Sequence, residues 1–283
     1  KRSLKHEFKI ADVLQMLTKL HRKYPKFPFT IMSYANIFYQ AGFKSLLEKF
    51  YDAGTGICHQ LMSYHALPGM LIVGSDSHTS TAGAFNAFAA GIDRTESARI
   101  WKMGETWFRV PESVRINLAG RLRLGVTAKD LALWIIGMIG SDGANYLSVE
   151  YHGDGIKCLS VSDRMTIANL ASEMGAKNAV FPPDNILFDF LGEKSKNSNP
   201  VWADEGSDYL RVIDIDLTEI DPVVSVPHNV DNVRTVAEVA GIPVHEGLIG
   251  TCTNGRIEDL RMAAEALRGK RIKKGFQLNV IPA

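Results

Sequence analysis

The chain has 283 residues, of which 46% are hydrophobic and 22% charged, and its formal net charge at pH 7 is +1. This is the composition of a folded globular protein with one large or two ordinary domains. The near-zero charge argues against nucleic-acid binding, and no apolar run has the length of a membrane span. Cys58, Cys158 and Cys252 are widely spaced and odd in number, which favours a reducing, cytoplasmic setting over a disulfide framework.

The first 60 residues lead toward a glycine-rich turn. Residues 1–43 carry a helical apolar pattern and then an aromatic stretch, both explained by core packing. We predict a helix over residues 43–50 and a turn over residues 52–56, where glycines let the backbone approach a ligand closely. His59 follows this turn. A histidine in this position is either a satisfied core residue or part of a site.

A polar cluster follows a short apolar run at residues 70–74. We interpret the run as a buried strand, and Asp76, Ser77, His78 and Thr79 then lie at its carboxyl end, where open α/β sheets place their chemistry. The structural alternative is a helix N-cap made by Ser77 or Thr79, and both roles can hold together. The small apolar residues 83–91 favour a helix packed tightly on the sheet.

The middle of the chain alternates between helical and strand patterns. We predict helices at residues 95–107, 127–140 and 164–175, and strands at 114–118 and 148–153. Ser162 or Asp163 is expected to cap the third helix, on which Asn169 and Glu173 lie four residues apart and so on one face. An exposed polar face is the ordinary explanation for such a pair. The strand at 148–153 ends in polar groups, Glu150 and His152, whose roles the sequence leaves open.

The polar stretch at residues 192–206 is the one break in composition that can separate two lobes. We therefore predict a first α/β lobe over residues 1–191, a linker over 192–208 and a second lobe over 209–283. The second lobe is expected to contain a strand at 209–217 and a helix beginning at Ala237. His228 lies in a predicted loop and receives no role.

An apolar strand runs into Cys252 and then into a second helical pattern. We predict a strand ending at Ile249, a sharp turn over residues 250–254, and a helix over 256–267. The predicted inward face of that helix consists of Ile257, Leu260, Ala264 and Leu267. A thiol just before a helix N-terminus is activated by the unpaired N–H groups, whereas a lone cysteine is more often a small buried hydrophobe.

Several of these strings resemble the aconitase family, in the branch of 3-isopropylmalate dehydratase large subunits and homoaconitases. They are Gly-Ile-Cys-His-Gln at 56–60, Gly-Ser-Asp-Ser-His-Thr at 74–79, the segment 165–176, and Cys-Thr-Asn-Gly-Arg at 252–256. The resemblance is continuous from Phe43. It implies three-layer α/β/α domains with mostly parallel sheets.

The resemblance also implies a site. Members of this family hold a four-iron four-sulfur cluster by three cysteines, and by resemblance Cys252 is one ligand, with the other two expected beyond residue 283. The catalytic residues it implies are His59, Asp76, His78 and Glu173. Ser77 and Thr79 are implied in substrate binding, and Asn169 and Asn254 are implied beside the cluster.

The implied activity is that of a hydro-lyase, which moves a hydroxyl on a hydroxy-dicarboxylate through a dehydrated intermediate, most like 3-isopropylmalate dehydratase in leucine biosynthesis. Its partner is a small subunit carrying a swivelling domain. The Asp-His dipeptide usual in the family is absent, and the chain looks incomplete. We therefore expect this chain alone to be inactive, to hold no intact cluster, and to leave the turn at 251–255 loosely held.

Three other interpretations stay open. The first is homoaconitase or aconitase, which share the strings above. The second is a cluster-free, aconitase-like binding protein without catalysis. The third, which ignores the resemblance, is a metal-dependent hydrolase built on His59, Asp76 and His78.

Overall fold

The structure, a computed structural model, describes residues 30–31, 49–51 and 54–283. Its contacts divide the chain into two units: residues 1–58 with 93–109, and residues 59–92 with 110–283. Within the described ranges, no helix is both long and apolar enough to span a bilayer. The predicted helix in residues 1–43 lies outside the described residues. The predicted lobe boundary at 192–208 falls inside the second unit and stays a prediction.

The first unit contains three described elements: β1 (Thr30–Ile31) and β2 (Lys49–Phe50), which pair in parallel, and α4 (Arg94–Met103). The strand β2 corrects the end of the predicted helix at 43–50. Helix α4 begins after Asp93, whose side chain accepts a hydrogen bond from the N–H of Glu96, and ends at Gly104 with φ of 75°. That left-handed glycine stops the helix before the predicted end at Trp107.

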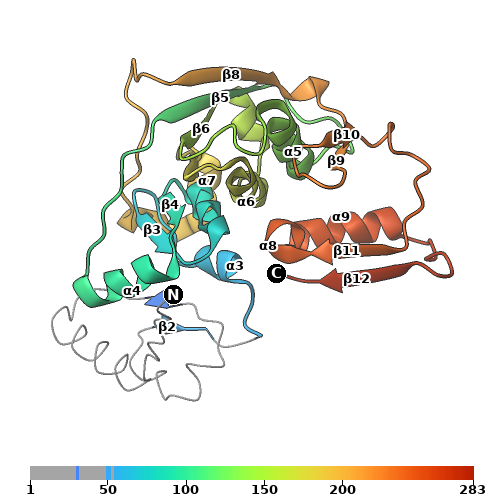
Figure 1. Cartoon of the computed structure of the whole chain (residues 1–283), viewed down its shortest axis with the longest axis horizontal. Coiled ribbons are helices and arrows are strands. Elements are labelled where there is room, and N and C mark those ends of the chain that lie inside the picture. The colour runs from blue at the N-terminus through green and yellow to red at the C-terminus, as the bar shows by residue number, and fades with distance from the viewer. Residues whose placement is uncertain (1–29, 32–48, 52–53) are drawn as a thin grey trace, which may run out of the picture. The chain divides into compact units, whose positions relative to one another are not determined.

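A parallel sheet of four strands dominates the second unit, in the order β7-β6-β5-β8. Its strands are β5 (Ser113–Ala119), β6 (Ser148–His152), β7 (Asn178–Val180) and β8 (Arg211–Asp216). Alternate residues of β5, namely Val114, Ile116 and Leu118, are fully buried against α5 (Ala128–Ile139) and α6 (Val161–Leu170). Figure 1 shows both helices on one face of this sheet. The buried side of the sheet therefore positions α6, which carries Asn169.

A second, smaller core lies around the parallel pair β3 (Leu71–Gly74) and β4 (Phe88–Gly91). Between these strands runs η2 (Ser77–Phe85), a 3-10 helix that is buried from Thr79 onward and packs on α6. Gly83 makes this close approach possible, because a Cβ there would lie 1.7 Å from the carbonyl oxygen of Ala179. The predicted helix at 83–91 is wrong: Asn86 adopts a left-handed φ of 58°, ends η2, and β4 follows.

A strand–helix–strand unit carries Cys252. Strand β11 (Glu246–Gly250) pairs in parallel with β12 (Gln277–Ile281), and α8 (Thr251–Asn254) and α9 (Ile257–Leu267) connect them. The predicted inward face of α9 is wrong for Ile257, Ala264 and Leu267, which are exposed, Ile257 by 52% and Leu267 by 41%. A pair of strands offers too little surface to cover the apolar stripe of an 11-residue helix.

The remaining elements connect these layers. They are α3 (Cys58–Met62), η3 (Asp154–Cys158), η4 (Ala171–Met174), α7 (Asn185–Leu191), η5 (Gly192–Asn197), η6 (Leu217–Glu219), β9 (Val223–Ser225) and β10 (Val233–Thr235). Strands β9 and β10 are antiparallel, whereas every other described strand pair is parallel. The α/β class with mostly parallel sheets is therefore confirmed. Residues 237–241, predicted to begin a helix, form turns instead.

The predicted helix at 164–175 is two elements. Helix α6 begins after Ser160, which is the N-cap in place of the predicted Ser162 or Asp163, and Asp163 completes a reciprocal capping box with it. It ends at Leu170, and the 3-10 turn η4 carries Glu173 to the left-handed Gly175. Asn169 and Glu173 therefore do not lie on one continuous helical face. The change of helix type turns Glu173 toward His78 while Asn169 stays buried.

Candidate active site

Asp76 organises the turn between β3 and η2. Its Oδ1 accepts a hydrogen bond from the backbone N–H of His78 at 2.8 Å, and its carbonyl accepts one from Thr79 Oγ1 at 2.7 Å. Asp76 is therefore the N-cap of η2, in place of the predicted Ser77 or Thr79. The cap fixes His78 on the first turn of η2 and leaves the Ser77 side chain exposed.

His59 reaches the same turn from α3. Its Nε2 lies 3.0 Å from Asp76 Oδ1, and the imidazole side chain is only 8% exposed. Burial lowers the pKa of His59 below its ordinary value, although the Asp76 carboxylate opposes this shift. For Asp76, burial alone would raise the pKa, but the hydrogen bonds from His78 and His59 lower it overall. A neutral imidazole and an ionised carboxylate are thus held together near neutral pH.

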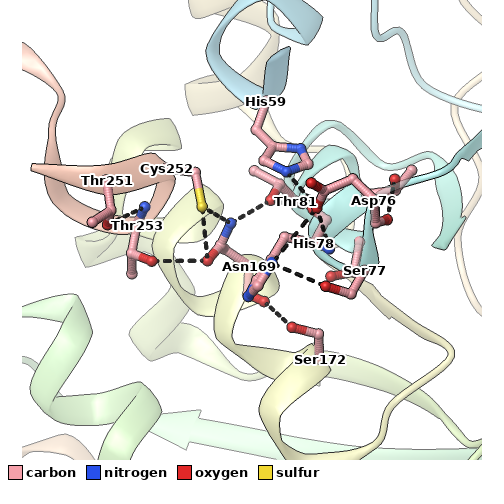
Figure 2. A network of polar contacts seen from close by, with 12 residues as sticks. His59, Asp76, Ser77, His78, Thr81, Asn169, Ser172, Thr251, Cys252 and Thr253 are labelled. Atoms are coloured by element: carbon pink, nitrogen blue, oxygen red, sulfur yellow. Dashed lines mark hydrogen bonds and ion pairs between the residues drawn. The ribbon is translucent and has the colours of Figure 1, made fainter. Parts of the chain in front are cut away.

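His78 pairs with a different carboxylate. Its Nε2 lies 3.1 Å from Glu173 Oε1, and its Nδ1 lies 3.2 Å from Ser77 Oγ and 3.6 Å from Asp76 Oδ1. The His78 side chain is 25% exposed and that of Glu173 39%. Figure 2 shows His59 and His78 approaching the same space from two elements. The site therefore contains two histidine–carboxylate pairs, of which His78–Glu173 is the more open to solvent.

Asn169 connects these pairs to the cysteine. Its side chain is fully buried on α6, and its Nδ2 donates to Thr81 Oγ1 at 2.8 Å and to Cys252 Sγ at 3.5 Å. Its Oδ1 accepts a hydrogen bond from Thr253 Oγ1 at 3.0 Å (Figure 2). Both ends of the amide are engaged, so the orientation of Asn169 is fixed.

Cys252 lies in α8, the single turn that follows β11. Thr251, just before it, has a left-handed φ of 72°, a strained conformation for a β-branched residue. The expectation of a loosely held turn at 251–255 stays a prediction, although Arg256 donates to the carbonyls of Cys252 and Thr253. Asn254 follows in the same turn, where its Nδ2 donates to Asp259 Oδ1 at 2.8 Å.

The ligand atoms of His59, His78 and Cys252 lie within 4.8 Å of one another. Imidazole and thiolate are ligands for transition metals, so this group can hold metal. Cys252 also suits one corner of an iron–sulfur cluster, because the amide N–H of Asn169 points at its sulfur and such donors stabilise cluster sulfurs. Cys158 is exposed on η3 and belongs to no metal-ligand group of the described residues. The described residues thus fit part of a cluster site and do not supply three cysteine ligands around Cys252.

One predicted site residue belongs to the turn, and three residues without a predicted role lie apart from the site. Thr79 is only 7% exposed and its hydroxyl donates to the Asp76 carbonyl, so we assign it to the turn. Glu150 and His152 lie 3.4 Å apart, and Glu150 accepts a hydrogen bond from Tyr209 Oη at 2.9 Å, in a separate network on the sheet. His228 is exposed between β9 and β10. Sequence reasoning missed Thr81 and Arg256, although Arg256 lies inside the string at 252–256 and Thr81 lies two residues after the string at 74–79.

Comparison with known proteins identifies relatives over most of the chain. The sequence profile of the aconitase family (aconitate hydratase) matches residues 37–241. A probable methanogen homoaconitase large subunit from Methanosarcina mazei is 48% identical over 240 residues, which is 84% of this chain and 61% of that protein.

Relatives named 3-isopropylmalate dehydratase large subunits are about as similar to this chain as the homoaconitase relative is. A 3-isopropylmalate dehydratase large subunit from Methanopyrus kandleri is 45% identical over 84% of this chain and 57% of its own length. One from Elusimicrobium minutum is 45% identical over 82% of this chain and 56% of its own length. The chain thus spans somewhat more than half the length of the curated relatives it matches. From the profile match and these identities, the chain belongs to the aconitase family.

Proposed function

We propose that this chain is part of the large subunit of a hydro-lyase that dehydrates a hydroxy-dicarboxylate, with 3-isopropylmalate as the substrate. In this proposal its side chains accept and donate the protons of the reaction. The observation that carries the proposal is the pair of histidine–carboxylate contacts, His59–Asp76 and His78–Glu173, beside Cys252. Elimination of water needs one group to accept a proton from carbon and another to protonate the leaving hydroxyl. Two pairs in unequal environments suit two such roles.

The more exposed pair is the better candidate for exchanging protons with substrate. In this proposal His78 carries the proton, and Glu173 orients the imidazole through its contact with Nε2. Ser77 Oγ, beside His78 Nδ1, donates a hydrogen bond to a substrate carboxylate. His59 is buried and neutral, and it orients Asp76. Asn169 fixes the Cys252 sulfur.

Aconitase-family proteins generally bind a four-iron four-sulfur cluster. Cys252 would hold it here together with cysteines outside this group, and when bound the cluster supplies Lewis-acid assistance to the departing hydroxyl. The relatives named large subunits support a small-subunit partner. Homocitrate is the second candidate substrate, because one relative is named a homoaconitase.

The test uses a protein extended to the length of the relatives, with iron and sulfide restored and the small subunit added. Dehydration of isopropylmalate, homocitrate and citrate is followed by absorbance of the unsaturated product. We expect turnover of isopropylmalate. His78→Ala should lower kcat by about 10²–10⁴-fold, whereas Ser77→Ala should raise KM and lower kcat. Absence of activity on all three substrates, with the cluster intact, contradicts the proposal. Near-normal kinetics for His78→Ala removes that residue from the mechanism.

A further inference from the structure

The guanidinium of Arg256 is buried beneath the Cys252 turn, and the residue is only 5% exposed. Its Nη1 donates to the Cys252 carbonyl at 2.9 Å and its Nη2 to the Thr253 carbonyl at 2.5 Å. The same Nη2 donates to Thr166 Oγ1 on α6. One planar fork therefore connects the backbone on which the thiol is mounted to the helix that carries Asn169.

Acidic side chains surround this buried cation. Asp259 Oδ2 accepts from the backbone N–H of Arg256 at 3.0 Å, and Glu258 and Asp163 also face it electrostatically. Burial lowers the pKa of Arg256, and these carboxylates oppose the shift. A buried cation is costly unless it is fully hydrogen-bonded, so its three acceptors around one turn indicate a specific role.

The turn needs such a restraint. The backbone strain at Thr251 directly precedes Cys252 and persists only where the surroundings hold it. Thr166 lies one helical turn before Asn169, and its Oγ1 also donates to the Thr253 carbonyl at 3.0 Å. The turn is thus held through its carbonyls by Arg256 and Thr166, and through its side chains by Asn169.

We propose that Arg256 is the positioning residue for Cys252, fixing where the thiol stands relative to Asn169 and the two histidines. Its role as ligand-positioning residue in a dehydratase rests on the function proposed above, but the restraint itself is a property of this chain. A lysine cannot replace it, because an ammonium lacks the planar fork that reaches carbonyls and hydroxyl together.

The test is the rate at which iodoacetamide alkylates Cys252 in the 283-residue chain, measured by peptide mass spectrometry. Cys158, which is exposed on η3, is the internal reference. We expect Arg256→Lys to raise the Cys252 rate, relative to Cys158, by about tenfold or more, because opening of the turn becomes easier. Arg164→Lys is the matched control: Arg164 is also fully buried on α6, but it bonds to Asp184 and the Ile156 carbonyl.

Thr166→Val provides a second variant that keeps the arginine and removes its α6 partner, and it should raise the rate about threefold. An unchanged rate in the folded Arg256 and Thr166 variants overturns the proposal, and so does an equal increase in Arg164→Lys. If Arg256→Lys does not fold, the Cys252 alkylation rate of Thr166→Val alone supports or overturns the proposal. The assay needs neither substrate nor cluster, so its result is independent of whether the extended protein dehydrates isopropylmalate.

Discussion

The sheet region around β5 and the strand–helix–strand region around Cys252 are held together by different forces. Around β5, Val114, Ile116 and Leu118 are fully buried. Around Cys252, by contrast, Leu248 and Ile281 are both 55% exposed. The first region is stabilised by apolar burial, whereas the second is fixed on α6 by polar contacts. The site therefore joins a well-packed half, here called the rigid half, in which α6 carries Asn169, to a cysteine placed by hydrogen bonds.

The strongest test of the rigid half is its buried ion pair. Arg164 Nη2 lies 2.6 Å from Asp184 Oδ2, and the Arg164 side chain is fully buried. Asp184→Ala leaves this guanidinium without a counter-ion, and we expect a loss of about 3–5 kcal/mol in the free energy of unfolding, measured by urea denaturation. Asp189→Ala, at an exposed position of α7, is the control and should change stability by less than about 0.5 kcal/mol. Similar losses for the two variants would contradict this assignment.

A matched pair of isoleucines compares the two regions directly. Ile116→Ala removes a fully buried side chain, and we expect it to lower the free energy of unfolding by about 2–5 kcal/mol. Ile281→Ala removes a side chain that is 55% exposed, with an expected change within about 0.5 kcal/mol. Equal losses in urea denaturation would show that the Cys252 region has a core of its own.

Acid should weaken the rigid half through Asp184. Burial alone would raise the pKa of Asp184, but Arg164 and the N–H of Leu187 lower it overall. A carboxyl with a lowered folded-state pKa contributes stability above its unfolded-state pKa, and this contribution is lost as pH falls through the folded-state value. The stability difference between wild type and Asp184→Asn should therefore be largest at pH 7 and narrow below about pH 4. Urea denaturation at several pH values measures it, and a difference independent of pH would refute the explanation.

The smallest expected effect concerns an exposed contact between the regions. Ser162 Oγ donates to Glu258 Oε2 at 3.1 Å, close to the Arg256 contacts but in solvent. Ser162→Ala should change the free energy of unfolding by about 0.5 kcal/mol or less and leave Cys252 alkylation unchanged. If Ser162→Ala raises the Cys252 alkylation rate more than Thr166→Val does, the Ser162–Glu258 contact restrains the turn rather than Arg256.

The sequence best predicted the elements in which the residue pattern and the capping residues agree with how the element packs. Strand β5 and helix α5 lie within two residues of their predicted ends, because alternation in one and a Thr127–Asp130 capping box in the other mark them clearly. Residues 83–91 were misassigned because small apolar residues suit helix and buried strand alike, and only the left-handed Asn86 decides between them.

The sequence predicted that the side chains of the candidate site lie together, but not how they pair. The resemblance named His59, Asp76, His78 and Glu173, yet nothing local says which carboxylate meets which histidine. Asp76 is two residues from His78, but its carboxylate lies closer to the imidazole of His59, 17 residues away, than to the imidazole of His78. Glu173 contacts the His78 imidazole across 95 residues. No local signal assigns a role to Arg256, because its partner Thr166 is 90 positions away.

The crossed pairing of the histidines has a consequence for assembly. Segment η2 supplies His78, and the residue that caps it, Asp76, belongs to the other pair. A shift of this one segment against α3 and η4 therefore breaks both pairs at once. An arrangement in which one histidine–carboxylate pair is formed and the other is broken is therefore disfavoured by the geometry. If the pairs handle protons as proposed, that capacity is gained or lost as a single step when these three segments dock.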